Sequence, residues 1–217
     1  MEKEKKSWFS EHLVSVILGL FTLIASCISG WFVYNQHTRD TMTDLRIEQM
    51  KQENKEKAEI TDRNVAVIYG DLWELLIKVN ADRVYIIQPH PQSNYHYLST
   101  FFEVSSKGVK KATEIIKNVP MQEVPIFSKE ISTNSWIFYN NMDEQVRDER
   151  VKAIIKLAGA KQVAILQLVN INGKWNGNLV ASRLTNNPFD EKDLHKEMKN
   201  TASMIQYILP AFDEELK

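Results

Sequence analysis

The side chains with the clearest capacity for chemistry are two histidines and one carboxylate in the middle of the chain. His90 and His96 flank a loop that contains Pro91 and Tyr95, and Glu103 lies midway along an apolar run. Two imidazoles can share a ligand or a metal when an acid partners them. Because no acid partners this pair, we interpret the histidines as loop residues and predict no metal site. Glu103 is either the carboxylate of a pocket or a residue that faces solvent.

Motifs of known enzyme classes are missing from the sequence. It contains no Gly-x-Ser-x-Gly elbow, no phosphate-binding glycine loop and no His-Glu-x-x-His pattern. Acids and bases are interspersed, and the formal net charge of −1 gives no field that would attract nucleic acid. We therefore expect a protein that is not an enzyme, that carries no cofactor and that does not bind nucleic acid.

A long apolar segment occupies the N-terminal part of the chain. No charged residue occurs from Leu13 to Gln36, and residues 13–34 as a helix would extend about 33 Å, enough to cross roughly 30 Å of hydrocarbon. The sequence thus predicts one transmembrane helix at 13–34 behind a tail of residues 1–12. Cys27, the single cysteine, keeps a lipoprotein anchor open as an alternative, and the lysine-rich start keeps a cleaved signal peptide open.

Small residues recur along this segment at spacings of 4, 3, 4 and 3, which places them on one face of the helix. They are Ser15, Gly19, Thr22, Ser26 and Ser29. Such a face lets two helices approach closely in lipid. It predicts self-association in the bilayer, with incidental composition as the alternative. The balance of Lys and Arg on the two sides favours a soluble domain outside the cytoplasm, in the periplasm of a bacterium.

A connector at residues 35–60 follows the apolar segment. It contains no Gly or Pro and alternates charge, with Glu53 and Lys57 at i, i+4, which is typical of a solvated helix. Apolar residues at its start do not continue as a heptad repeat. We interpret the connector as a helical spacer.

Residues 61–210 show helical and strand patterns in alternation, and residues 211–217 form a C-terminal tail. The patterns predict a helix at 61–79, strands at 84–87 and 97–104, a helix at 109–116, a strand at 135–139, a helix at 151–158 ended by Gly159, a hairpin of strands at 162–170 and 178–184 around Asn172-Gly173, and a helix from Asp190 to Leu209. Strands in runs with helices packed on the sheet predict an α+β domain with a mainly antiparallel sheet.

The order of these elements resembles the GAF and PAS class of regulatory domains. The likeness is strongest in the final unit, from the strand at 163–169 through the hairpin turn to residues 187–191. The string at 187–191, Asn-Pro-Phe-Asp-Glu, superficially resembles the Asn-Lys-Phe-Asp-Glu signature of nucleotide-binding GAF domains. Since the lysine is missing and the residues are contiguous, we interpret the string as a helix start. The resemblance implies a ligand pocket, for which the candidates are Tyr85, Phe101, Glu103 and Leu168.

Two functions follow from the plan of the whole chain. Tail, membrane helix and compact domain are together similar to phage holins of the T type, although the tail is shorter than theirs. That resemblance implies oligomers in the inner membrane of a bacterial host, release of an endolysin, host cell lysis, and an antiholin bound by the soluble domain. The alternative is a membrane-tethered, GAF-like protein that senses a ligand or binds a partner from the cytoplasm.

Overall fold

The computed structural model describes residues 26, 28–31, 34, 50–52, 55, 59–91 and 94–210. The chain divides into two compact units, Met1–Glu59 and Ile60–Lys217. Nearly all the described residues belong to the second unit, which contains the sheet and its helices.

One antiparallel sheet of six strands forms the centre of the second unit, in the order β3-β2-β1-β6-β5-β4. The strands are β1 (Arg83–His90), β2 (Tyr97–Ser105), β3 (Val119–Pro120), β4 (Trp136–Tyr139), β5 (Gln162–Val169) and β6 (Trp175–Arg183). The α+β class and the antiparallel sheet predicted from the sequence are confirmed.

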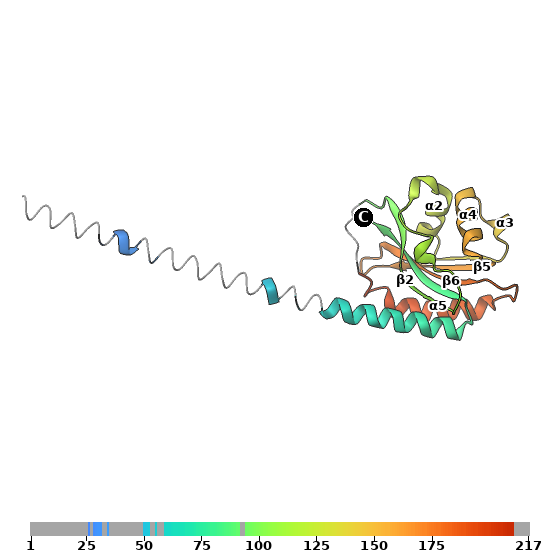
Figure 1. Cartoon of the computed structure of the whole chain (residues 1–217), viewed down its shortest axis with the longest axis horizontal. Helices are drawn as coiled ribbons and strands as arrows, with labels where there is room; N and C mark the ends of the chain where they lie inside the picture. Colours follow the sequence, from blue (N-terminus) through green and yellow to red (C-terminus); the bar gives the residue numbers. More distant parts are fainter. Residues whose placement is uncertain are drawn as a thin grey trace, which may run out of the picture. The chain divides into compact units, whose positions relative to one another are not determined.

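Helices cover both faces of this sheet, as Figure 1 shows. They are the helix at 60–78, α2 (Pro125–Thr133), α3 (Met142–Gln145), α4 (Glu149–Ala158) and α5 (Glu191–Ile205), with 3-10 turns η1 (Ala112–Glu114) and η2 (Met121–Glu123). Residues 60–78 and α5 pack on one face, together with Val84 and Ile86 of β1. Residues from α2 and α4 pack on the other face, together with Tyr85 and Ile87. The alternation follows from the pleat, which directs successive side chains to opposite sides.

Several predicted elements are found with the expected chemistry at their ends. The side chain of Asp190 caps α5 by accepting a hydrogen bond from the N–H of Asp193 at 3.1 Å. Phe189 and Leu194 are both buried in the same core, as a hydrophobic staple requires. Gly159 ends α4 in the left-handed region, with φ 70°.

Two features of the middle of the domain differ from what the sequence predicted. The expected helix at 109–116 is only the single turn η1, because its N–H groups are bound by a carboxylate from β2. The helix α2 was not predicted, since only Ser128 and Ile131 of its residues are buried and they leave no apolar stripe.

Strand β1 is longer than predicted and runs through Pro89 to His90. A proline was expected to stop it. Its pairing with β6 ends at Ile87, whereas its pairing with β2 continues to His90. Pro89 therefore lies where one side of the strand is unpaired, and its missing N–H removes no bond from the ladder.

The predicted membrane segment lies mainly outside the described residues, as do the tails at 1–12 and 211–217. Ser15, Gly19 and Thr22 of the small-residue face are among the residues not described, whereas Ser26 and Ser29 are helical and exposed. Within the described residues, no helix has the length and apolar character needed to cross a membrane. In the connector, residues 50–52 and 55 are helical and exposed.

Two glycines provide a matched test of the sheet. Gly177 has φ 141°, and a Cβ added there would lie 2.6 Å from the carbonyl oxygen of Ile87, whereas Gly173 has φ 70° and open space around it. We expect Gly173→Ala to lower the free energy of unfolding by about 1 kcal/mol and Gly177→Ala by about 3 kcal/mol, because only the second also displaces backbone. Urea denaturation measures both. Equal losses would contradict the close approach of β6 to β1.

Candidate functional site

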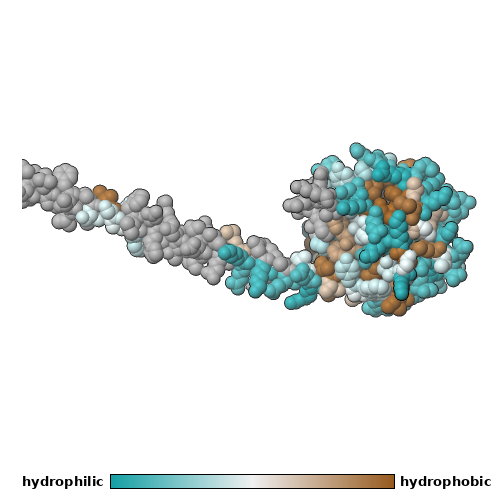
Figure 2. Space-filling model, in the orientation of Figure 1, coloured by the Kyte–Doolittle hydropathy of each residue, from teal (hydrophilic) through white to brown (hydrophobic). Residues whose placement is uncertain are grey.

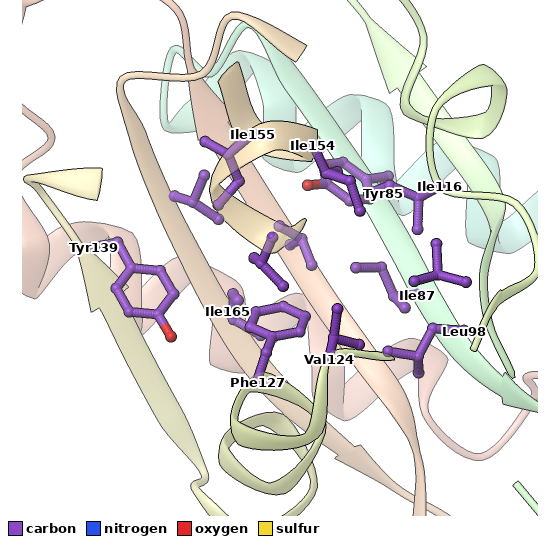
Figure 3. Close-up of a pocket in the computed structure, with 14 residues that line it drawn as sticks. Tyr85, Ile87, Leu98, Ile116, Val124, Phe127, Tyr139, Ile154, Ile155 and Ile165 are labelled. Atoms are coloured by element: carbon purple, nitrogen blue, oxygen red, sulfur yellow. The ribbon is translucent and has the colours of Figure 1, made fainter. Parts of the chain in front are cut away.

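An apolar cavity lies between the sheet and the cover formed by α2 and α4. Its volume is about 40 Å³. The lining residues are Tyr85, Ile87, Leu98, Ile116, Val119, Val124, Phe127, Tyr139, Val151, Ile154, Ile155, Val163, Ile165 and Val180 (Figure 3). All of them belong to, or pack against, the core on the second face of the sheet.

The two walls of the cavity differ in burial. Strand residues form the inner wall, where Ile165 is 2% exposed and Val180 is fully buried. The outer wall is half-buried at Ile116, Phe127 and Ile154. Figure 2 shows one of several apolar patches of the surface in the region of α2. The outer wall is thus the less buried one.

Two tyrosine hydroxyls are the polar groups of the lining. The hydroxyl of Tyr139 donates to Oε2 of Glu130 at 2.8 Å, and in Figure 3 Tyr139 lies apart from the other labelled residues. The hydroxyl of Tyr85 has no hydrogen-bond partner among residues 59–91 and 94–210, its oxygen is not fully buried, and it lies toward α4 in Figure 3. Burial raises the pKa of Tyr85 to about 12. Two smaller effects act in opposite directions, since Arg83 lowers this pKa and Glu103 raises it. Both phenols remain protonated at neutral pH.

Polar contacts at their ends hold the covering helices in place. The N–H of Phe127 donates to Oδ2 of Asp148 at 2.6 Å, which joins the start of α2 to the start of α4. The other end of α2 is bound to the sheet, because Nδ2 of Asn178 donates to the carbonyl oxygen of Ile131 at 2.9 Å. Arg150 of α4 also forms an ion pair with Glu123 of η2. The cover is therefore fixed at its ends, while its middle rests on apolar contacts.

A buried arginine joins the remaining walls to β1. Nη1 of Arg83 donates to the carbonyl oxygen of Lys110 and Nη2 to that of Ala158, both at 2.9 Å. The side chain is 1% exposed, and it forms no ion pair within the described residues. Its guanidinium carbon lies 5.9 Å from the ring centroid of Tyr85. A positive charge is thus held beside one end of the cavity.

The four pocket residues predicted from the sequence lie in different places. Tyr85 lines the cavity. Glu103 instead accepts hydrogen bonds from the N–H groups of Ala112 and Thr113, at 2.7 and 2.9 Å, and so holds η1. Leu168 lies in the core on the opposite face of the sheet, and Phe101 packs against that same core. The cavity is therefore lined by only one of the four.

The two histidines are separated by the structure. Nε2 of His90 lies 2.9 Å from Oγ of Ser99, and the ring of His90 is fully buried at the end of β1. His90 is thus a core residue and not the loop residue that we expected. His96 is exposed. Among the described residues, no group of three or more His, Cys, Asp or Glu side chains is placed to hold a metal ion.

A second hollow beside α4 has a polar lining and a volume of about 390 Å³. Lys156 and Lys161, which line it, are exposed, and Asp143 lines it with the opposite charge. Although it is the larger hollow, we favour the apolar cavity as the candidate site, because a ligand there is removed from water and held by packing.

Comparisons with solved structures identify the fold. The blue-light-absorbing form of the Thermosynechococcus elongatus PixJ GAF domain is 11% identical, with a TM-score of 0.55 over 68% of this chain and 87% of that chain. The phycocyanobilin-bound GAF domain of a cyanobacterial phytochrome is 16% identical, with a TM-score of 0.52 over 69% and 91%. No family model and no curated protein matches the sequence. The domain therefore has the fold of a GAF domain.

The buried hydroxyl of Tyr85 predicts a pH dependence of stability. Below about pH 10 the phenol is protonated in both the folded and the unfolded chain, so its contribution to the free energy of unfolding is fully present. Between pH 10 and about 12 only the unfolded chain releases the proton, so stability falls by about 2 kcal/mol. We expect Tyr85→Phe to lose less stability over this window in urea denaturation. Tyr207→Phe, at an exposed tyrosine, is the control, and identical pH profiles for wild type and Tyr85→Phe would contradict the burial.

Proposed function

We propose that the domain at 60–210 is a non-enzymatic binding module that senses a small molecule in the cavity under α2 and α4. The observation that carries the proposal is the apolar cavity between the sheet and a thin helical cover. Pockets of this composition, with a few polar groups, are the usual sites of small ligands. Two similar structures are a phycocyanobilin-bound and a phycoerythrobilin-bound GAF domain from a cyanobacterial phytochrome, which supports ligand binding as a use of this fold.

A bilin does not suit this chain as the ligand. The only cysteine of the sequence is Cys27, so residues 60–217 contain no thiol to which a bilin could be attached. The cavity of about 40 Å³ is also far below the roughly 300–1,000 Å³ of pockets for drug-sized ligands. The proposed ligand is therefore small.

We further propose that residues 13–34 tether the domain to a membrane and that copies associate through the tether. The length of the uncharged segment and its face of small residues support this. The interpretation as a T-type phage holin depends on the order of segments alone. No comparison supports it, so the tethered sensor is the function we propose.

Filling the cavity tests the binding function. Val163 lines the cavity, whereas Val84 lies fully buried on the opposite face. In a thermal-shift screen of small apolar compounds with the full chain, a ligand at about 100 times its Kd should stabilise wild type by about 2.7 kcal/mol, a rise of roughly 5–10 °C in Tm. Val163→Phe should abolish that rise in Tm. If Val163→Phe does not fold, Val163→Ile takes its place and should reduce the rise.

Val84→Ile is the control for this experiment, because it adds a methylene to the core without reaching the cavity. It should keep the ligand-dependent rise in Tm even if its own Tm is lower. The function is wrong if no compound stabilises wild type more than Val163→Phe or Val163→Ile.

Fractionation of cells tests the tether. The full chain should sediment with bacterial membranes and resist extraction with alkaline carbonate, whereas a variant without residues 13–34 should be released. Protease added to spheroplasts then reports the side of the membrane, since only a periplasmic domain is cut. Release of the full chain by carbonate would exclude the tether.

A further inference from the structure

We infer that the cavity selects a small, uncharged and mostly hydrocarbon molecule with one oxygen acceptor, such as a ketone or an ether, which receives a hydrogen bond from Tyr85. This inference rests on the proposed function, that the cavity binds a ligand. It adds the chemical class of the ligand and the group that recognises it.

The lining excludes an ionised ligand. Apart from two tyrosines and Phe127, every residue around the cavity is Ile, Leu or Val, and none carries a charge. A buried ion without a counter-charge or hydrogen bonds is strongly disfavoured. Of the charged groups nearby, Glu103 binds two N–H groups, Glu130 binds Tyr139, and Arg83 donates to the carbonyl oxygens of Lys110 and Ala158. A neutral ligand is therefore favoured over a carboxylate or a phosphate.

The hydroxyl of Tyr85 provides the recognition. Tyr85 is 7% exposed, and within the part of the chain that the structure describes its hydroxyl has no hydrogen-bond partner. The hydroxyl oxygen itself is still reached by solvent, so the acceptor of a ligand takes the place of water there, and a hydrogen bond of this kind contributes roughly 0.5–1.5 kcal/mol. Tyr139 offers no such gain, because its hydroxyl already donates to Glu130. One hydrogen bond, at Tyr85, is thus available to a ligand.

The charge of Arg83 decides that the ligand is an acceptor. The guanidinium carbon lies 5.9 Å from the ring centroid of Tyr85 and carries a positive charge without an ion pair in the described residues. A nearby cation withdraws electron density from the phenol and makes its O–H a better donor. The carboxylate of Glu103 acts in the opposite sense, and its effect on Tyr85 is the smaller of the two.

The size of the ligand follows from the outer wall. A cavity of about 150 Å³ holds benzene, so the present cavity of about 40 Å³ admits a six-membered ring only if its cover moves. Ile116, Phe127 and Ile154 are half-buried, whereas Ile165 and Val180 behind them are buried, so we expect the cover and not the sheet to give way. The ligand is thus of about the size of one ring, and its entry displaces the cover.

A pair of isosteric probes tests the inference. Cyclohexanone and methylenecyclohexane differ in one oxygen, which replaces a methylene group. Each probe is titrated into the full chain, whose isoleucine methyl groups are labelled for NMR. Changes in the methyl chemical shifts of Ile87 and Ile165 report binding, and those of Ile86 and Ile205 on the opposite face are internal controls. We expect Tyr85→Phe to weaken the binding of cyclohexanone by about tenfold and to change the affinity for methylenecyclohexane by less than a factor of about two.

The control variant is Tyr139→Phe, which should change the two affinities by the same factor because its hydroxyl is not available to the probes. Equal effects of Tyr85→Phe on both probes would overturn the role of Tyr85. Tighter binding of cyclohexanecarboxylate than of cyclohexanone, measured at the same methyl groups, would overturn the choice of a neutral ligand. In both cases the cavity would still bind ligands. If neither probe shifts Ile87 and Ile165 in wild type, the proposed function fails together with the inference.

Discussion

The domain depends on the burial of β1 on both of its faces. All eight residues of the strand are buried, and it pairs with β2 on one side and β6 on the other. Because its side chains alternate between two cores, the sheet requires a helical layer on each side. The two layers are unequal. The helix at 60–78 and α5 contribute long apolar faces to the first, whereas α2 buries only Ser128 and Ile131 in the second. The cavity lies under the weaker layer.

Two buried arginines attach loops to the sheet without the help of carboxylates. Arg83 binds the carbonyl oxygens of Lys110 and Ala158, and the second of these lies at the C-terminal end of α4, where a cation is favoured. Arg183 binds four carbonyl oxygens and lies 3.9 Å from the ring centroid of Phe189. The contact of Arg83 fixes the end of α4 over the cavity, whereas the contacts of Arg183 fix the ends of segments on the opposite face.

The sequence predicts correctly the elements in which an apolar pattern repeats over several turns. The prediction fails where a single distant residue determines the local structure. The helix at 60–78, α4, α5 and the hairpin around Gly173 were all predicted, since period and caps agree there. The helix expected at 109–116 failed because Glu103, distant in sequence, binds its N–H groups. The residues that line the cavity were harder to predict than the elements. In β5 residues of both faces are buried, so no polar alternation reveals which side each residue faces, and Leu168, predicted as a pocket residue together with Tyr85, lies on the opposite face from it.

The division of the two faces determines how a ligand could be sensed. A molecule under α2 and α4 contacts Tyr85 and Ile87, while the helix at 60–78, which follows the connector, packs on Val84 and Ile86. These residues alternate along one strand, so a displacement on the cavity side reaches the helix only through the backbone of β1. The backbone of a central strand is held by its ladders and moves little. Under the proposed function, a ligand in this cavity acts mainly on its own cover, so α2 and α4 are the elements whose surface would change.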